Sequence, residues 1–153
     1  EASRRQLELF PAQARLALSA VDEQQAAAAL LGAPLMCDYA TISLSDLLVP
    51  WSSVERRIEA VAAADLVVAL YNPASQRRRQ HLARAREILL RYRSPETPVG
   101  VVRNAGRPGQ TVTLTDLAHL LDQPIDMLTV VIVGNSATVR VGSRMVTRRG
   151  YGG

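Results

Sequence analysis

The chain has 153 residues, a formal net charge of +4, and 48% hydrophobic against 21% charged residues. This length and ordinary globular composition predict one domain, or one domain and part of another, with a hydrophobic core, and they argue against a disordered chain and a coiled coil. Aromatic residues make up only 4% of the chain, which argues against a single-stranded nucleic-acid binder, because such proteins stack bases on aromatic side chains.

The cysteine count and the lengths of the hydrophobic runs indicate the compartment and the kinds of partner to expect. Cys37 is the only cysteine, so we expect no disulfide within the chain, no multi-cysteine metal site, and a reducing cytoplasm. No run approaches the ~18 to 20 apolar residues that span a bilayer, and Arg4-Arg5 are not followed by the apolar core of a signal peptide. The sequence therefore predicts no metal, no membrane partner and no nucleic-acid partner.

The first part of the chain predicts one helix and one strand. Residues 1–20 carry mixed charge without a clear period, so they form a poorly determined lead-in. An alanine-rich helix is predicted at residues 22–31, ended by Gly32. A strand is predicted at residues 38–43, a loosely alternating run that includes the β-branched residues Thr41 and Ile42.

Two further helices are predicted on either side of a central strand. Ser52 and Glu55 have the spacing of a capping box, which predicts a helix at residues 53–64. The next helix is predicted at residues 76–92, with Arg77 and Arg78 in its first turn. Cations at a helix N-terminus oppose the macrodipole at a cost of ~0.3 to 1 kcal/mol each, so a compensating anionic partner is expected there.

The central strand is predicted at residues 65–73, a short unbroken apolar run that ends in an Asn-Pro turn. The run becomes polar at Tyr71 and Asn72. In open α/β sheets, ligands bind outside the carboxyl ends of the strands. The search for a site therefore begins at Tyr71.

The second half of the chain predicts three more strands, each preceded or followed by turn residues. They lie at residues 99–103, 110–114 and 129–133. A short helix capped by Thr113 or Thr115 and ending at Leu121 is predicted between the last two strands, and residues 136–147 are predicted to form a hairpin about Gly142. Five strands with intervening helices predict an α/β fold, with a five-stranded mixed sheet and flanking helices.

Six motifs along the chain together resemble one family. They are Gly32-Ala33-Pro34-Leu35, Ile42-Ser43-Leu44-Ser45-Asp46-Leu47-Leu48, Pro50-Trp51, Ala69-Leu70-Tyr71-Asn72-Pro73, Thr97-Pro98-Val99-Gly100-Val101-Val102-Arg103-Asn104-Ala105 and Val133-Gly134-Asn135-Ser136. These motifs resemble those of precorrin-3B C17-methyltransferases, which are class III tetrapyrrole methylases, and the resemblance runs from about Val21 to Tyr151.

The resemblance implies an enzyme of cobalamin biosynthesis. Such an enzyme transfers a methyl group from S-adenosylmethionine to C17 of precorrin-3B, and the macrocycle contracts to give precorrin-4. Members of the family have two α/β domains with the cofactor between them, and residues 21–153 resemble the second, C-terminal domain. The resemblance therefore implies a missing N-terminal methylase domain, an anionic tetrapyrrole substrate and a homodimer, and the chain is expected to be inactive alone.

The resemblance also implies site residues, carried over by position. The adenosyl part of the cofactor is expected to contact backbone groups at Leu70, Tyr71, Asn104, Ala105, Asn135 and Ser136. Three arginines are expected to pair with the acetate and propionate groups of the substrate, since guanidinium and carboxylate form charge-assisted pairs: Arg77, Arg78 and Arg107. No residue can be assigned as an acid or base for ring contraction.

Two alternatives to the C17 enzyme remain open at the level of sequence. The first is another corrin or uroporphyrinogen methylase of the same fold, which would differ in the carbon that it methylates. The second is a non-catalytic binding domain that keeps the fold, because no glycine-rich cofactor loop precedes Gly32.

Overall fold

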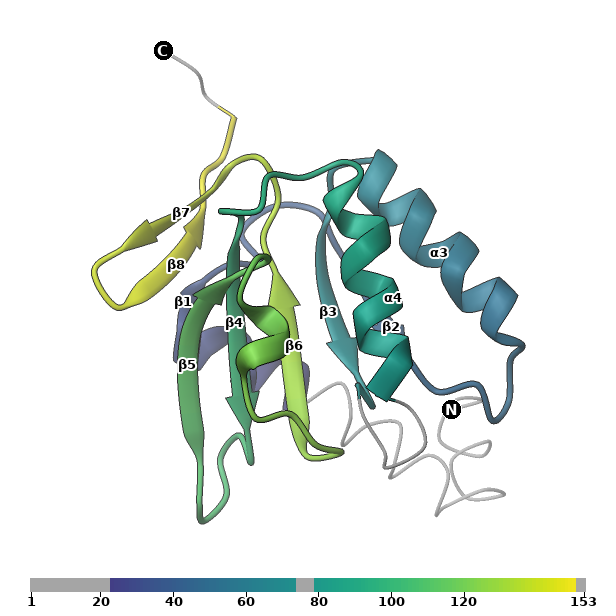
Figure 1. Cartoon of the computed structure of the whole chain (residues 1–153). Coiled ribbons are helices and arrows are strands. Elements are labelled where there is room, and N and C mark those ends of the chain that lie inside the picture. The colour runs from purple at the N-terminus through teal and green to yellow at the C-terminus, as the bar shows by residue number, and fades with distance from the viewer. Residues whose placement is uncertain (1–22, 74–78, 151–153) are drawn as a thin grey trace, which may run out of the picture.

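The structure, a computed structural model, describes residues 23–73 and 79–150. Its centre is a five-stranded sheet with the strand order β2-β3-β6-β4-β5 (Figure 1). The strands are β2 (Tyr39–Ser43), β3 (Val67–Tyr71), β6 (Thr129–Val133), β4 (Pro98–Arg103) and β5 (Thr111–Asp116). The five-stranded mixed sheet expected from the sequence is confirmed.

Strand direction decides which residues meet at each end of this sheet. Strand β2 runs parallel to β3, whereas β6 is antiparallel to both β3 and β4, so β2, β3 and β4 run the same way. In Figure 1 the arrowheads of β3 and β4 point down and that of β6 points up. We call the end of the sheet where β2, β3 and β4 terminate the carboxyl edge, and the opposite end the amino edge.

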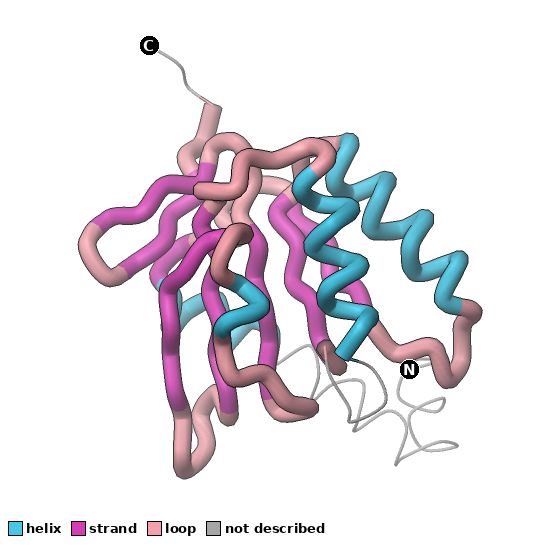
Figure 2. The backbone as a smooth tube through the Cα atoms, viewed as in Figure 1, coloured by secondary structure: helices cyan, strands magenta, loops and turns pink. Residues whose placement is uncertain are grey.

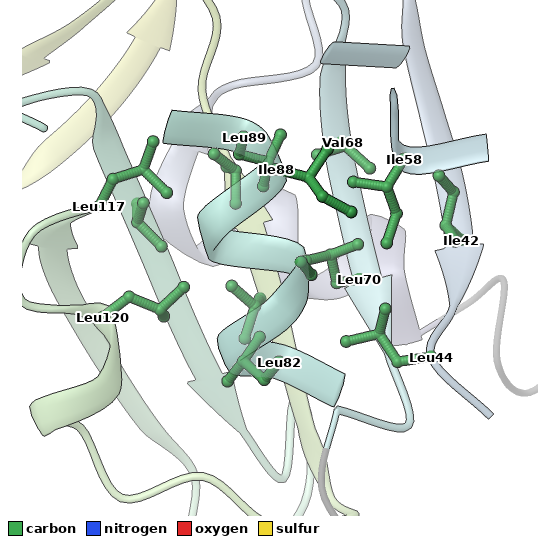
Figure 3. Packing of buried hydrophobic residues seen from close by; sticks show 14 of the residues in the cluster. Ile42, Leu44, Ile58, Val68, Leu70, Leu82, Ile88, Leu89, Leu117 and Leu120 are labelled. Carbon is green, nitrogen blue, oxygen red and sulfur yellow. The ribbon is translucent and has the colours of Figure 1, made fainter. Parts of the chain in front are cut away.

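Helices α3 (Trp51–Ala63) and α4 (Arg79–Leu90) cover one face of the sheet (Figure 1). The buried residues of α3 recur every four positions, at Val54, Ile58 and Ala62. This spacing places them on one stripe that faces the sheet. Figure 3 shows Ile58 of α3, and Ile88 and Leu89 of α4, packed around Val68 and Leu70 of β3.

The other face of the sheet is covered by a helix at residues 23–31 and by a second, smaller sheet (Figure 2). The small sheet has the order β1-β8-β7 and consists of β1 (Gly32–Ala33), β8 (Arg144–Thr147) and β7 (Thr138–Val141). The helix lies very close to β4, since a Cβ added to Gly100 would lie 2.2 Å from Cδ1 of Leu31. The result is three layers with a core on each face of the central sheet.

The predicted hairpin is confirmed as β7 and β8, joined through Gly142 with a φ of 60°. Its parallel pairing with β1 was not expected, because a strand of two residues has no detectable period.

Two sequence predictions about helix starts are wrong. The capping box at Ser52 does not form: α3 begins at Trp51, two residues before the predicted start, and no side chain caps it. The predicted helix from Thr113 or Thr115 to Leu121 is replaced by the continuation of β5 to Asp116 and a short 3-10 helix, η1 (Leu120–Asp122). Pairing of Thr113–Asp116 with β4 takes these residues into the sheet.

Within residues 23–73 and 79–150, no helix combines the length and the apolar character that crossing a membrane requires. The same residues contain no group of three His, Cys, Asp or Glu side chains arranged to hold a metal ion.

Candidate functional site

Two asparagines mark the carboxyl edge. Asn72 follows β3 and Asn104 follows β4, and both adopt left-handed backbone conformations, with φ values of 52° and 51°. Asparagine tolerates this region better than most residues other than glycine. Each strand therefore ends in a sharp reversal that leaves backbone groups at the rim of the sheet, where α/β folds bind their ligands.

The end of β3 offers backbone rather than side-chain groups. Leu70 is fully buried in the core beneath α3 and α4, so only its main chain can reach a ligand, and Tyr71 is half-buried. The carbonyl oxygen of Tyr71 accepts a hydrogen bond from the Leu44 N–H at 2.9 Å. Asn72 Nδ2 donates to Ser43 Oγ at 3.2 Å, which links the ends of β2 and β3.

The loop after β4 lies at the same edge. Asn104 N–H donates to the Leu128 carbonyl at 3.1 Å, and the Asn104 carbonyl accepts from Arg107 N–H at 2.9 Å. Ala105 packs against the core beneath the helix at residues 23–31. Gly106 has a φ of 71° and open space around its Cβ position, which leaves room beside the backbone of this loop. The structure thus brings Leu70, Tyr71, Asn104 and Ala105 to one edge.

Asn135 and Ser136 lie at the other edge, because β6 runs antiparallel to β3 and β4. Asn135 Nδ2 donates to the Asp65 carbonyl at 2.9 Å, and Ser136 N–H donates to Asp65 Oδ1 at 3.0 Å. The length of a five-residue strand, ~17 Å, separates them from Tyr71. Asn135 and Ser136 line a different cavity of about 350 Å³. Asn135 and Ser136 therefore do not share an edge with the other four expected contact residues, and their contact with the cofactor stays a prediction.

The direction of β6 brings the residues before that strand to the carboxyl edge instead. Arg103 at the end of β4 pairs with Thr129 at the start of β6. Thr129 closes a turn in which Leu128 N–H donates to Asp126 Oδ1 at 2.9 Å, and Met127 and Leu128 are each nearly half exposed. The sequence shows the Asp-x-x-Thr pattern of this turn at residues 126–129. Its place at the carboxyl edge depends on the direction of β6, which no local sequence pattern reveals.

A cavity of about 560 Å³ opens at the carboxyl edge, between α4, η1, the end of β4 and the segment that precedes β6. Its lining is mostly apolar with one ion pair: Leu82, Ala83, Arg103, Leu121, Gln123, Pro124, Ile125 and Asp126. Arg103 Nε donates to Asp126 Oδ2 at 2.6 Å. Partial burial would raise the pKa of Asp126, but hydrogen bonds from Arg103, Leu128 N–H and Thr129 outweigh it and hold that pKa below its ordinary value. Asp126 thus stays ionised.

The three arginines expected to bind substrate have different outcomes. Arg77 and Arg78 lie outside the described residues. Arg107 is at the carboxyl edge, where its Nη2 lies 2.7 Å from Glu23 Oε1 in an ion pair with the helix at residues 23–31. A substrate carboxylate would therefore have to compete with Glu23 for this guanidinium.

Comparison with known proteins gives matches to one family. The sequence pattern of the family described as Tetrapyrrole (Corrin/Porphyrin) Methylases matches residues 17–121. The chain is 55% identical over 124 residues to the cobalt-factor III methyltransferase of Priestia megaterium, a match that covers 81% of this chain and 23% of that protein. It is 52% identical over 126 residues to the probable cobalt-factor III C(17)-methyltransferase of Salmonella typhimurium, covering 82% of this chain and 52% of that protein.

Solved structures give the same fold. The crystal structure of the methyltransferase CobJ superposes with a TM-score of 0.74 at 38% identity, over 81% of this chain and 52% of CobJ. The cobalt precorrin-4 methyltransferase CbiF shares the fold, with a TM-score of 0.56 at 21% identity over 71% of this chain and 47% of CbiF. The chain thus spans about half the length of these proteins, and less of the Priestia one. Because the family's sequence pattern covers more than half of the chain and CobJ has the same architecture, the chain belongs to the tetrapyrrole methylase family.

Proposed function

We propose that this chain forms one half of a methyltransferase that methylates C17 of a precorrin-3B-type tetrapyrrole in cobalamin biosynthesis, with contraction of the macrocycle to the precorrin-4 level. The observation that carries the proposal is the 52% identity to the Salmonella protein, whose name specifies C17 of cobalt-factor III. The substrate macrocycle either carries cobalt, as in cobalt-factor III, or is metal-free, as in precorrin-3B. Assaying methyl transfer to both substrates distinguishes the two.

S-adenosylmethionine is the proposed methyl donor, and the carboxyl edge fits it. The cavity of about 560 Å³ is within the ordinary size range of ligand pockets, and it combines apolar walls with a few polar groups. The backbones of Leu70, Tyr71, Asn104 and Ala105, which lie at the same edge but do not line that cavity, would hold the adenosyl part. When bound, the cofactor supplies a sulfonium methyl group that needs no side-chain nucleophile, so the chain's own part is to orient both ligands and exclude water.

A second domain is proposed to cover the carboxyl edge and complete the crevice. The first argument is length, since the chain spans 52% of the Salmonella protein. The second is exposed apolar surface at this edge: Leu47 and Leu48, in the loop that follows β2, are 77% and 96% exposed. Large apolar side chains exposed together typically mark an interaction surface. A homodimer and a cytoplasmic location stay predictions.

A chimera tests the proposed function. This chain replaces the matched half of the Salmonella protein, and transfer of labelled methyl from S-adenosylmethionine to cobalt-factor III or precorrin-3B is measured, with the site of methylation read by NMR of the product. We expect methylation at C17 by the chimera and none by either half alone. Methylation at another carbon would favour a related corrin methylase, and a folded chimera without transfer would favour a binding domain.

A further inference from the structure

We propose that His81 is a positioning residue for the carboxyl edge: its Nδ1–H holds the peptide of Leu44, and that peptide holds the end of β3 at Tyr71. The inference rests on the proposed function, in which the backbone of Tyr71 contacts the cofactor. His81 is the third residue of α4, which begins at Arg79.

Two hydrogen bonds join His81 to Tyr71 through a single residue. Leu44 N–H donates to the Tyr71 carbonyl at 2.9 Å, and the Leu44 carbonyl lies 2.9 Å from His81 Nδ1. A carbonyl oxygen can only accept, so Nδ1 must carry the proton in this contact. The N–H of Leu44 is thereby bonded to β3 and its carbonyl to α4.

The imidazole ring is held in orientation by α3. It stacks on the indole of Trp51 with 3.9 Å between the ring centroids and 7° between the ring planes. Trp51 Nε1 donates to Glu55 Oε1 at 2.8 Å, and Arg84 Nε donates to the same oxygen at 2.7 Å. The hydrogen bond from Arg84 holds the pKa of Glu55 below its ordinary value, so this acceptor stays ionised.

The second ring nitrogen faces a carboxylate of the loop that carries the exposed leucines. His81 Nε2 lies 3.9 Å from Asp46 Oδ2, and the histidine side chain is only 16% exposed. His81 therefore contacts the loop after β2 at two points, the Leu44 carbonyl and Asp46, while Trp51 covers its ring.

Packing alone does not require histidine at this position. A phenylalanine, although larger, would also present a flat ring that can stack on Trp51. The property that histidine adds to a flat ring is the Nδ1 donor, and its acceptor belongs to the residue that bonds directly to Tyr71. We therefore assign the function of His81 to this donor, which fixes the strand end without touching the ligands.

Two substitutions separate the donor from the ring. His81→Phe keeps the ring and removes the donor, whereas His81→Asn removes the ring and keeps an N–H that can reach the place of Nδ1. His119→Phe is the matched control, because His119 is exposed and its ring contacts Asp116. Three quantities are measured: hydrogen exchange of the Leu44 amide in the full chain, and the dissociation constant of S-adenosylmethionine and the melting temperature in the chimera.

We expect His81→Phe to speed exchange of the Leu44 amide and to weaken binding of S-adenosylmethionine about fivefold, the effect of losing one neutral hydrogen bond. His81→Asn should restore both, although it loses the stacking on Trp51 and melts lower. If His81 has a purely structural role, the affinity for S-adenosylmethionine should follow the melting temperature, so His81→Asn should bind more weakly than His81→Phe. His119→Phe should change neither exchange nor affinity.

The inference is overturned if His81→Phe binds the cofactor as tightly as the parent, or if His81→Asn is as weak as His81→Phe. Failure of the proposed function has a different signature, in which the parent chimera itself binds no S-adenosylmethionine. In that case hydrogen exchange of the Leu44 amide in the full chain tests the positioning contact by itself. Faster exchange in His81→Phe supports the contact, and unchanged exchange overturns it.

Discussion

At the scale of single residues, backbone conformation matters more at the candidate site than side-chain chemistry. Asn72 and Asn104 both have positive φ, and each directly follows a strand that ends at the carboxyl edge. Two independent strands thus use the same residue type for the same reversal. Leu70 contributes through its main chain only, because its side chain is fully buried.

Gly100 provides the sharpest residue-scale prediction. A Cβ at this position would lie 2.2, 2.5 and 2.9 Å from three atoms of Leu31, which is itself fully buried. Gly100→Ala should therefore push the helix at residues 23–31 away from β4 and lower the free energy of unfolding by ~1 to 3 kcal/mol. Urea unfolding measures this loss.

Gly150→Ala is the control for that substitution, since nothing lies within 4 Å of its Cβ position. Combining Gly100→Ala with Leu31→Ala should cost less than the sum of the two single changes, because the clash and the cavity relieve each other. Additive costs would show that the close approach of Leu31 is not the reason for glycine.

At the scale of elements, the sequence predicts the features that depend on a local pattern of residues, such as the existence of a strand. The apolar runs at β3, β4 and β6 are unbroken because these strands are buried on both faces, so their existence was predictable. The direction of β6 was not predictable, since it depends on pairing with β3 and β4, and it is this direction that places Asn135 and Ser136 at the amino edge. The failed capping box has a similar cause: Glu55 bonds to Trp51 and Arg84 rather than to the helix end.

The turn before β6 gives a prediction about pH. The pKa of Asp126 is below its ordinary value in the folded chain, so its contribution to stability is present above the unfolded value of about 3.9 and is lost as pH falls through the folded pKa. Asp126→Asn should therefore lower the urea midpoint at pH 7 and lower it less at pH 3. Asp122→Asn, at an exposed site in η1, is the control. An equal loss at both pH values would contradict the role of the charge.

At the scale of the whole molecule, several arginines are committed to contacts within the chain. Arg86 Nε donates to the Leu117 carbonyl at 2.6 Å, which ties α4 to the segment after β5. Arg93 is buried and its Nη1 donates to the Gly134 carbonyl at 2.7 Å. Arg86 and Arg93 keep their positive charge, but these donors bind carbonyl oxygens of the chain itself rather than groups of a ligand.

Arg107 tests whether charge at the carboxyl edge acts on the substrate. In the chimera, Arg107→Ala should weaken binding of the tetrapyrrole by about two- to fivefold, the range of an exposed ion pair, and leave S-adenosylmethionine binding unchanged. Glu23→Gln should have the opposite effect, because it removes the carboxylate that lies 2.7 Å from Arg107 and competes for it. Calorimetry at low salt measures both. Arg57→Ala, on the exposed side of α3, is the control.

Salt separates a charge effect from a change of shape. Raising ionic strength screens exposed pairs, so it should weaken tetrapyrrole binding more in the parent chimera than in Arg107→Ala, which has already lost the interaction. Glu23→Gln should show the steepest dependence of the three, since its Arg107 is free to pair with the substrate. If Arg107→Ala and Glu23→Gln both bind the tetrapyrrole as the parent does, with the same dependence on salt, Arg107 serves only to hold the loop at residues 104–109 against the helix at residues 23–31. The substrate carboxylates would then be recognised by other groups, and the assignment to the tetrapyrrole methylases would stand unaffected.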